Sequence, residues 1–480
     1  MNLSAKLNTN DFSVIDHMTY VLCGDGDLME GISYEAASLA GHLKLNKLVV
    51  LYDSNDISLD GNLDISFSEN VKQRFESQNW EVLTVKDGED TNAINEAINM
   101  AKKSDKPTLI EVKTIIGFGS NKKAGTSAAH GAPLGNEELT YAKEQYGLSN
   151  EAFKVDSEVY EDFEAGIVKR GLEAYNEWNK NAETYMSLEN ENSTILRRLL
   201  NNEKVEIDMP AFTEEVASRI SSQNAIQEIA AQDPLFIGGS ADLSCSNNTI
   251  IKTDGKFVID SDDQRNIFFG VREFAMGAML NGMALHSGLN VYGSTFMVFS
   301  DYLKPAIRLS SLMSLPVTYV FTHDSIAVGE DGPTHQPVEQ LAMFRSMPNC
   351  NVIRPCDANE TQAAWKYAYE STKTPTILAL TRQNLKQISE KDIDKNYENL
   401  KRGAYVIYEA EKWDRIIIAT GSEVELAIEV AVELKKFDIN CRVVSMPCQE
   451  LFDAQPIEYI NEILPENATS RYAIEMISPF

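Results

Sequence analysis

Two acidic loops near the start of the chain have the residue types of a magnesium site. Gly24-Asp25-Gly26 and Asp53-Ser54-Asn55 each follow a short apolar run that predicts a strand. Successive parallel strands place such loops at the same edge of a sheet, where α/β proteins bind ligands. The carboxylate of Asp25, the amide carbonyl of Asn55 and the backbone carbonyl of Ile57 are hard oxygen ligands, which suit Mg²⁺.

Such a site would also accept a diphosphate, because Mg²⁺ keeps coordination positions for water or phosphate oxygens. The glycine after Asp25, Gly26, allows the backbone to approach a bound phosphate closely. A lone Gly-Asp-Gly is more often an ordinary turn. The appearance of Asn55 about thirty residues later, with a predicted helix and strand between, favours the magnesium interpretation.

A long polar loop in the second half of the chain gathers further residues capable of chemistry. The segment THDSIAVGEDGPTHQPVEQ follows a predicted strand and contains His323, Asp331 and His335. Binding and catalytic residues are concentrated in such loops. Two arginines, Arg219 and Arg382, suit bidentate recognition of phosphate, although each alone is more often a surface residue in an ion pair.

One carboxylate and three aromatic side chains form another candidate group. Glu273 lies where a predicted strand passes into an apolar helix, in FFGVREFAMGAMLNGMALHSG. The helix macrodipole alone favours an acid there, and a buried catalytic acid is the alternative. Phe296, Phe299 and Tyr302 recur at i, i+3 and i+6, which predicts roughly one side of a helix and, by spacing alone, packing in a core.

The elements that position these residues are predicted to form an α/β protein. Apolar runs alternate with helical stretches over residues 20–120, again over 235–380, and a third time from Gly403 onward. This alternation is typical of doubly wound units with parallel sheets. Residues 140–210 are instead charged and helical and end in a linker near 206–210. A chain of 480 residues is too long for one core, so several domains are expected.

Composition excludes several classes of function. The chain carries 43 lysines and arginines against 72 aspartates and glutamates, a net charge of −29. Such a surface repels nucleic acid and anionic membrane, so a phosphate site would need a local positive island. Six cysteines without Cys-x-x-Cys spacing indicate reduced, mostly buried thiols of a cytoplasmic protein. The sequence has no apolar stretch of about 18 residues that would predict a membrane span.

The segment GDGDLMEGISYEAASLAGHLKLNKLVVLYDSNDISLDG resembles the thiamine diphosphate motif of the transketolase family. The resemblance extends over nearly the whole chain. It implies that Mg²⁺, with Ca²⁺ or Mn²⁺ as substitutes, is bound by Asp25, Asn55 and Ile57, and that Gly26 contacts the diphosphate. It also places His130, in KTIIGFGSNKKAGTSAAHGAPLG, beside the diphosphate and the substrate hydroxyls.

The same resemblance assigns roles in the pyrimidine-binding part. It implies that Glu273 is the acid that activates the cofactor, that His335 contacts the aminopyrimidine, and that both act in catalysis with His130. Asp331 is implied to recognise a substrate hydroxyl. By similarity, Phe296, Phe299 and Tyr302 are implied to surround the cofactor ring. Asp242 is implied to contact either the cofactor or the partner subunit. By similarity, the substrate phosphate is implied to be bound by Arg219, Ser246, His323 and Arg382.

The resemblance further implies three units. These are a partial diphosphate-binding domain with a helical extension at 1–205, a pyrimidine-binding domain at 210–392 and a partial C-terminal domain at 400–480. The implied reaction is reversible transfer of a two-carbon ketol group from a ketose phosphate to an aldose phosphate, through the C2 carbanion of thiamine diphosphate, in the pentose phosphate pathway. The family binds its cofactor between two subunits, so a cytoplasmic homodimer acting on sugar phosphates is expected.

Alternatives stay open within this resemblance. The family has a longer N-terminal part with three histidines, to which His17 and His42 do not correspond, and a longer C-terminal domain. A sheet without its first strands is expected to expose an apolar edge. The chain is therefore also interpretable as a catalytically silent fragment, or as a split-gene subunit that needs an N-terminal partner polypeptide. Among enzymes, dihydroxyacetone synthase is the alternative, whereas the phosphate-binding residues disfavour a deoxyxylulose-phosphate synthase.

Overall fold

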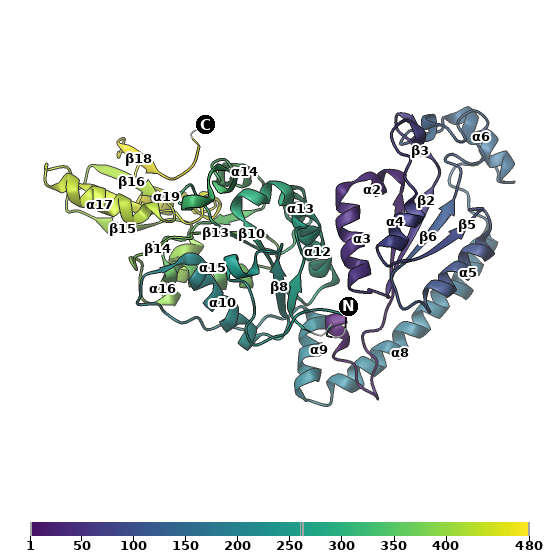
Figure 1. Ribbon diagram of the computed structural model, residues 1–480, viewed down its shortest axis with the longest axis horizontal. Coiled ribbons are helices and arrows are strands. Elements are labelled where there is room, and N and C mark those ends of the chain that lie inside the picture. The colour runs from purple at the N-terminus through teal and green to yellow at the C-terminus, as the bar shows by residue number, and fades with distance from the viewer. Residues whose placement is uncertain (1, 260, 262–263, 479–480) are drawn as a thin grey trace. The chain divides into compact units, whose positions relative to one another are not determined.

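The computed structural model describes residues 2–259, 261 and 264–478. The chain forms two compact units, the first reaching to Glu189 and the second starting at Asn190 (Figure 1). Each unit is built around parallel strands with helices packed against them. The predicted α/β fold is therefore confirmed.

The first unit contains a four-stranded parallel sheet in the order β1-β2-β6-β5. Its strands are β1 (Thr19–Gly24), β2 (Leu48–Ser54), β5 (Glu81–Val85) and β6 (Thr108–Lys113). Buried side chains join one face of the sheet to α3 (Gly31–His42) and α4 (Val71–Ser77), and the other face to α5 (Thr91–Ala101) (Figure 1). Because both faces are covered, β2 begins with the apolar run Leu48–Tyr52, whereas Glu111 interrupts the apolar residues of β6.

The outer edge of this sheet is exposed along β1. Val21 is 40% and Leu22 is 82% exposed, and among the described residues β1 pairs only with β2. This is the apolar edge that the sequence predicts. Its unpaired backbone groups are a template for a further strand.

The remaining elements of the first unit are mostly helical. They are α1 (Asn2–Ala5), α2 (Asp25–Met29), the hairpin β3 (Ile57–Ser58) and β4 (Gly61–Asn62), α6 (Asn136–Gln145), α7 (Ser157–Phe163) and α8 (Lys169–Met186). The Trp178 indole N–H donates to Val14 O at 2.9 Å, and Tyr185 Oη donates to Leu7 O at 2.6 Å. These bonds tie α8 to the segment before β1, and the predicted helical region is confirmed.

The second unit contains a six-stranded parallel sheet in the order β12-β13-β11-β10-β8-β9. Its strands are β8 (Phe236–Ser240), β9 (Asn266–Phe268), β10 (Asn290–Phe296), β11 (Thr318–Thr322), β12 (Asn351–Ile353) and β13 (Thr376–Leu380). One face packs on α10 (Ser218–Gln232) and α15 (Ala358–Glu370). The helices α12 (Glu273–His286) and α13 (Ser300–Leu312) pack together closely, because a Cβ at Gly277 would lie 2.7 Å from the Ala306 side chain.

A second sheet of this unit lies toward the C-terminus, in the order β15-β17-β16-β18. We refer to it as the C-terminal sheet. Its strands are β15 (Tyr405–Glu409), β16 (Arg415–Ala419), β17 (Cys441–Ser445) and β18 (Arg471–Ile474), of which only β15 is antiparallel to its neighbour. The other elements of the unit are α9 (Glu191–Asn201), β7 (Val216–Ala217), α11 (Ser244–Asn247), α14 (Gln340–Arg345), β14 (Asn384–Leu385), α16 (Ile393–Lys401), α17 (Glu423–Lys435), α18 (Gln449–Asp453) and α19 (Ile457–Ile463).

Among the strands of three residues or more, β5, β10 and β15 were not anticipated from the sequence, and neither were the two-residue strands β3, β4, β7 and β14. The most consequential is β10, whose sequence NVYGSTF contains Gly, Ser and Thr in place of an unbroken apolar run. Six of its seven residues are nonetheless buried. Small and hydroxylated residues fit there because α12 approaches closely, and a Cβ at Gly293 would lie 2.3 Å from the Leu280 side chain.

The cysteines behave as the sequence predicts. All six are unpaired thiols, and four of them are buried. Burial raises the pKa of the Cys350 thiol to about 12, so this group is inert at neutral pH. Across the part of the chain that the structure describes, no helix has both the length and the apolar character needed to cross a membrane.

Candidate functional site

The residues predicted to bind a metal lie at the carboxyl edge of the first sheet. Gly24, the last residue of β1, is in register with Asp53 of β2, so the loops after these strands are neighbours. Asp25 opens α2, and Asn55 directly follows β2. The backbone N–H groups of Asn55 and Asp56 donate to Asp25 Oδ2 at 3.2 Å and 3.0 Å. The fold thus brings Asp25 and Asn55 together.

Asp25 is a buried carboxylate whose described hydrogen-bond donors are all uncharged. The residue is 3% exposed, and Tyr52 Oη donates to its second oxygen. Burial raises the pKa of this carboxyl, although the hydrogen bonds from Tyr52 and the two amides act in the opposite direction. A divalent cation would supply the positive charge that these donors lack. The oxygen donors of this loop therefore fit Mg²⁺.

The other two predicted ligands share one tight loop. Asn55 Oδ1 accepts a hydrogen bond from the Ile57 N–H at 3.1 Å, and Asn55 Nδ2 donates to Asp53 Oδ1 at 3.3 Å. Between them, Asp56 has a left-handed backbone with φ of 60°, a conformation that Asp tolerates better than most residues. The geometry places Asn55 and Ile57 beside each other, and their assignment as metal ligands stays a prediction.

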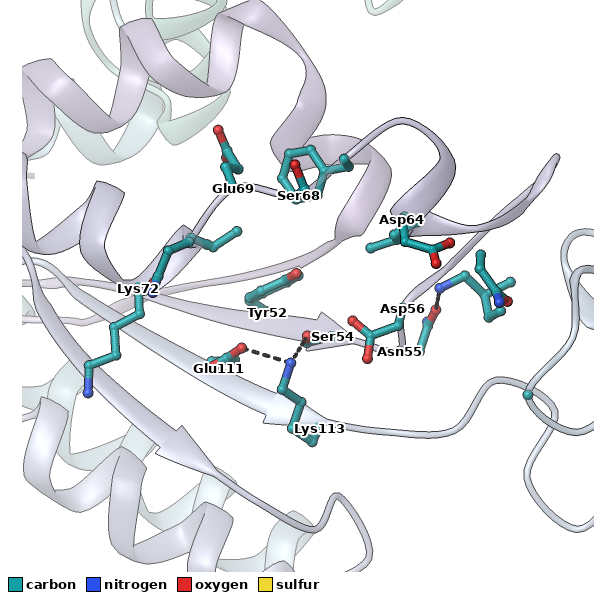
Figure 2. A pocket seen from close by; sticks show the side chains of 17 residues that line it. Tyr52, Ser54, Asn55, Asp56, Asp64, Ser68, Glu69, Lys72, Glu111 and Lys113 are labelled. Carbon is teal, nitrogen blue, oxygen red and sulfur yellow. Dashed lines mark hydrogen bonds and ion pairs between the residues drawn. The ribbon is translucent and has the colours of Figure 1, made fainter.

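An open cavity of about 900 Å³ borders this loop (Figure 2). Its lining includes Asn55 and Ile57 but not Asp25. Lys113 Nζ donates to Ser54 Oγ at 2.7 Å and pairs with Glu111 at 3.0 Å (Figure 2). The cavity adjoins the predicted metal site. The charge of Lys113 is already paired with Glu111, so this lysine does not mark an anion site in the cavity.

Gly26, in the first turn of α2, and His130, on the loop after β6, both follow strands at the same edge of the sheet. His130 ends a 3₁₀ turn (Ser127–Ala129) after β6 and is exposed. The start of its loop is fixed at the edge, because the Thr114 N–H donates to Ser54 O at 3.2 Å. No atom lies within 4 Å of a Cβ built on Gly26. Packing within this chain therefore does not require glycine there, and the space that a phosphate would need is open.

In the second unit, the predicted substrate and ring residues converge at the carboxyl edge of the six-stranded sheet. The loops that follow its strands carry Asp242 and Ser246 (after β8), Glu273 (after β9), Phe299 (after β10), His323, Asp331 and His335 (after β11) and Arg382 (after β13). Phe296 is the last residue of β10, and Arg219 lies in the first turn of α10. Ligand sites of parallel α/β sheets are formed at this edge.

Four rings form one aromatic cluster. The Phe296 and Phe299 rings are stacked with centroids 5.7 Å apart. The His323 ring lies 4.0 Å from that of Phe296, and the His335 ring lies 5.8 Å from Phe296 and 5.3 Å from Phe299. The cluster therefore joins two predicted ring-pocket residues to two predicted substrate histidines.

The prediction that Phe296, Phe299 and Tyr302 follow one side of a helix is wrong. Phe296 ends β10, Phe299 closes a 3₁₀ turn (Met297–Phe299), and only Tyr302 belongs to α13. The missed strand β10 explains the error. Tyr302 is 71% exposed, and the ring contacts of the described residues do not include one between it and the cluster. Its place in a ring pocket stays a prediction.

Two guanidinium groups lie at the sheet edge that carries His323, one in the first turn of α10 and one after β13. Arg219 Nη1 donates to Ser246 O at 2.6 Å, and Arg382 Nη1 donates to Asp331 Oδ2 at 3.0 Å. Burial, followed by the charge of Arg382, lowers the pKa of Arg219. Burial, followed by the charges of Arg219 and Arg382, lowers the pKa of His323 to about 4. Arg382 is paired with Asp331 and, at 3.2 Å, with Glu330, whereas Arg219 donates to a backbone carbonyl. The two guanidinium groups are the positive charges that a phosphate site in this acidic chain would use.

The orientation of His323 is set by a buried chain of hydrogen bonds. Thr322 Oγ1 donates to Asn247 Oδ1 at 2.6 Å, so it accepts from His323 Nδ1 at 2.9 Å. Asn247 Nδ2 in turn donates to Ser294 Oγ at 2.6 Å. In neutral His323 the lone pair is therefore on Nε2. Protonation at Nε2 would convert that atom into a donor for an anion.

Glu273 and Asp242 follow the neighbouring strands β9 and β8 at the same sheet edge. Glu273 is the first residue of the fourteen-residue helix α12 and is half-buried. That position is favourable for a carboxylate because of the helix macrodipole. Asp242 has a left-handed backbone with φ of 64° in the loop after β8. The catalytic and cofactor roles of both residues stay predictions.

The residues that orient His323 were not predicted from the sequence. Thr322, Asn247 and Ser294 are fully buried polar residues, and none was singled out. A usable signal was present, because Thr322 and Ser294 are hydroxyl residues in the buried strands β11 and β10. A buried hydroxyl needs a hydrogen-bond partner, so each should have been read as part of a network.

Comparison with known proteins gives three matches along the chain. The transketolase thiamine diphosphate binding domain matches residues 1–205, the transketolase pyrimidine binding domain matches 214–387, and the transketolase-like C-terminal domain matches 403–480. Together these three families account for nearly all of the sequence.

Individual relatives agree with these matches. The transketolase of Bacillus subtilis strain 168 is 54% identical over 100% of this chain and 73% of the relative. A crystal structure of a Pichia stipitis transketolase variant with fructose 6-phosphate is 41% identical, with a TM-score of 0.95 over 100% of this chain and 73% of that one. The Campylobacter jejuni transketolase is 40% identical, with a TM-score of 0.89 over 99% and 76%. The chain therefore belongs to the transketolase family.

Proposed function

We propose that this chain catalyses reversible transfer of a two-carbon ketol group from a ketose phosphate to an aldose phosphate. The observation that carries the proposal is the convergence of Arg219, Arg382 and His323 beside an aromatic cluster, in a chain of this family. Pichia stipitis relatives have been crystallised with fructose 6-phosphate, sedoheptulose 7-phosphate and xylulose 5-phosphate. Each of these ligands carries a phosphate that a pair of guanidinium groups suits.

The two groups of residues fit the cofactors of such a reaction. Thiamine diphosphate, when bound, supplies the nucleophilic carbon that takes up and releases the two-carbon group. Asp25, Asn55 and the Ile57 carbonyl would hold Mg²⁺, with Ca²⁺ or Mn²⁺ as substitutes. The diphosphate would lie against Gly26 and His130. The thiazolium–pyrimidine part would contact Asp242, Glu273, Phe296, Phe299, Tyr302 and His335.

Different residues of the chain would then act in substrate recognition and in proton transfer. Glu273 holds a proton for the pyrimidine ring at the start of α12. His335 contacts the aminopyrimidine and the substrate, and His130 contacts substrate hydroxyls. Asp331, which is oriented by Arg382 at 3.0 Å, selects the configuration of one hydroxyl. The substrate phosphate is bound by Arg219, Ser246, His323 and Arg382.

We also propose that the working form is a cytoplasmic homodimer with the cofactor between subunits, without nucleic-acid or membrane partners. The net charge of −29 supports the last part. A second candidate is a split-gene subunit that pairs with an N-terminal polypeptide. Such a polypeptide would add a strand at the exposed edge of β1, where Leu22 is 82% exposed.

The test is calorimetric binding of thiamine diphosphate with Mg²⁺, followed by turnover of fructose 6-phosphate with an aldose phosphate acceptor. Binding and turnover by the chain alone support the first candidate. Turnover that appears only after addition of the N-terminal part of a transketolase supports the second. Preference for formaldehyde over the aldose phosphate would instead indicate dihydroxyacetone synthase. Absence of cofactor binding with and without the added polypeptide would overturn the proposal.

A further inference from the structure

A buried charge network joins the predicted substrate loop to the C-terminal sheet. Arg354 follows β12 and is fully buried. Its Nε donates to Asp324 Oδ2 at 2.7 Å, and its two terminal nitrogens bind the Glu423 carboxylate, with Nη2 at 3.2 Å from Oε1. Asp324 is 2% and Glu423 is 4% exposed. One guanidinium therefore bridges the loop after β11 and the first residue of α17.

Two loops of the C-terminal sheet contact the backbone of Arg354, one after β17 and one after β16. The Arg354 N–H donates to Pro447 O at 2.9 Å, and the Gly421 N–H donates to Arg354 O at 3.0 Å. Gly421 has φ of 54°, and a Cβ there would lie 2.7 Å from Arg354 Cγ. Glycine is thus required at this position by both backbone conformation and contact. The guanidinium cannot shift far without moving the loop between β16 and α17.

A second arginine anchors the far end of the substrate loop in the same network. Arg345, the last residue of α14, donates from both terminal nitrogens to the Glu475 carboxylate at 2.7 Å. Thr420 Oγ1 also donates to Glu475. The adjacent Met476 N–H donates to Glu423 Oε2 at 2.9 Å. The carboxylates that hold Arg345 and Arg354 are therefore connected through the segment after β18.

The two anchored points enclose the residues assigned to substrate. Asp324 comes directly after His323, whose φ of 59° is left-handed, and Arg345 ends α14, the helix that follows the loop. Asp331 and His335 lie between these points. The Ser478 N–H donates to Val338 O at 2.8 Å, which adds a contact from the C-terminal segment to the middle of this stretch.

Stability alone is a weak reason for such a network. Burying ions carries a large desolvation penalty, and apolar residues of similar volume often replace a buried ion pair without loss of stability. Ions provide directional hydrogen bonds, which apolar residues do not. The hydrogen bond from Arg354 to Asp324 holds the residue that immediately follows His323 in place.

We propose that Arg354 is a positioning residue that holds His323 and the 324–345 stretch in the conformation that recognises a phosphate. The C-terminal sheet, whose own residues are not assigned to substrate, thereby acts in substrate recognition through Glu423 and Glu475. The choice of phosphate as ligand rests on the proposed function. The position of His323 can be measured without turnover. A failure of the positioning role of Arg354 can therefore be distinguished from a failure of the proposed function.

The test compares two pairs of buried ions in the full chain. The variant Asp324→Asn/Arg354→Met removes the proposed positioning pair. The control Asp233→Asn/Arg198→Met removes another buried pair, with 2.7 Å between Arg198 Nη2 and Asp233 Oδ1. Asp233 precedes β8 and therefore lies at the opposite edge of the six-stranded sheet. Both variants are titrated with inorganic phosphate, and the ring signals of the six histidines are followed by NMR.

The expected result is a rise of about tenfold in the phosphate Kd for Asp324→Asn/Arg354→Met, the size expected from losing one charged hydrogen bond. The His323 signal should shift or broaden before phosphate is added. The control should change the phosphate Kd less than about twofold at a comparable loss of Tm. An unchanged phosphate Kd and His323 signal in the first variant would overturn the proposal.

A milder variant keeps the proposal testable if the double variant does not fold. Glu423→Gln preserves shape but removes one charge from the network, and we expect it to perturb the His323 signal and raise the phosphate Kd about threefold. An intact signal and Kd would overturn the proposal. If the wild-type chain binds no phosphate, the proposed function fails, and the His323 signal alone decides the positioning role. If phosphate binds as described but no turnover occurs, only the proposed function fails.

Discussion

The two candidate sites of this chain have opposite electrostatic character. In the first unit, Asp25 is a buried carboxylate with uncharged donors around it, and burial raises its pKa. In the second unit, Arg219 and Arg382 lie beside His323, and their charges lower its pKa. The first site therefore presents a buried carboxylate to a metal cation, and the second presents two guanidinium groups to a phosphate.

This contrast shows how one acidic chain can bind both a cation and anions. The overall charge of −29 suits the first site but opposes the second. The second site overcomes it locally, through guanidinium groups that converge at one sheet edge and are partly shielded from solvent. Charge at a site is set by the loops that meet there, and not by the composition of the chain.

Glu273 offers the largest expected effect. Glu273→Gln keeps the shape of the side chain but removes the proton that the reaction needs, so turnover should fall about 10³-fold. Cofactor affinity should change far less. The control Asp394→Asn alters an exposed acid in the first turn of α16 and should leave turnover unchanged. If Glu273→Gln retains turnover within tenfold of wild type, Glu273 is not the activating acid and only stabilises the start of α12.

Arg382 tests the anion side of the comparison. Arg382→Met removes the donor that lies beside Asp331 and His323, and the KM for a ketose phosphate should rise about 10-fold to 100-fold. Arg382→Lys should recover part of the loss, because lysine keeps the charge but not the bidentate geometry. Steady-state kinetics separates KM from kcat here. An unchanged KM would place the phosphate elsewhere.

Asp25 tests the cation side. Asp25→Asn should weaken Mg²⁺-dependent binding of thiamine diphosphate at least about tenfold, while phosphate binding in the second unit stays unchanged. Because burial raises the pKa of Asp25, its ionised form is destabilising at neutral pH without a metal. The variant should therefore be at least as stable as wild type in metal-free buffer. Titration calorimetry and thermal unfolding check both parts, and a large fall in metal-free Tm would contradict them.

His323 gives the smallest effect and a pH dependence of known sign. Its folded-state pKa of about 4 lies below the ordinary value of 6.5, so between these values the unfolded chain binds more protons. Stability should then fall as pH falls through this window, with a slope from this residue of at most about 1.4 kcal/mol per pH unit. His323→Asn should flatten the denaturation curve against pH. An identical pH dependence in both proteins would show that His323 does not titrate as described.

The fold was largely predictable from the sequence, because buried parallel strands are continuous apolar runs. The runs at 48–52 and 376–380 became β2 and β13 with boundaries close to those expected. The strand β10 was missed since its Gly293, Ser294 and Thr295 are buried by tertiary packing and not by their own hydrophobicity. That error also misplaced the backbone of Phe296 and Phe299.

The candidate site was predictable in its residue types but not in its supporting contacts. Asp25, His323 and Arg382 follow recognisable strands, so their shared edges could be inferred from sequence order. The links from Asn247 to Thr322 and from Arg354 to Asp324 span 75 and 30 residues and depend on side-chain direction. Sequence spacing carries no information about such directions.

The most direct test of the central claim is transfer of a labelled two-carbon group. Fructose 6-phosphate carrying ¹³C in its first two carbons is incubated with an aldose phosphate, thiamine diphosphate and Mg²⁺, and the products are followed by NMR. We predict that the label appears in a ketose phosphate two carbons longer than the acceptor, together with an unlabelled four-carbon aldose phosphate, and that Glu273→Gln abolishes both. Label that stays in fructose 6-phosphate, with the cofactor bound and the N-terminal polypeptide supplied, would contradict the account.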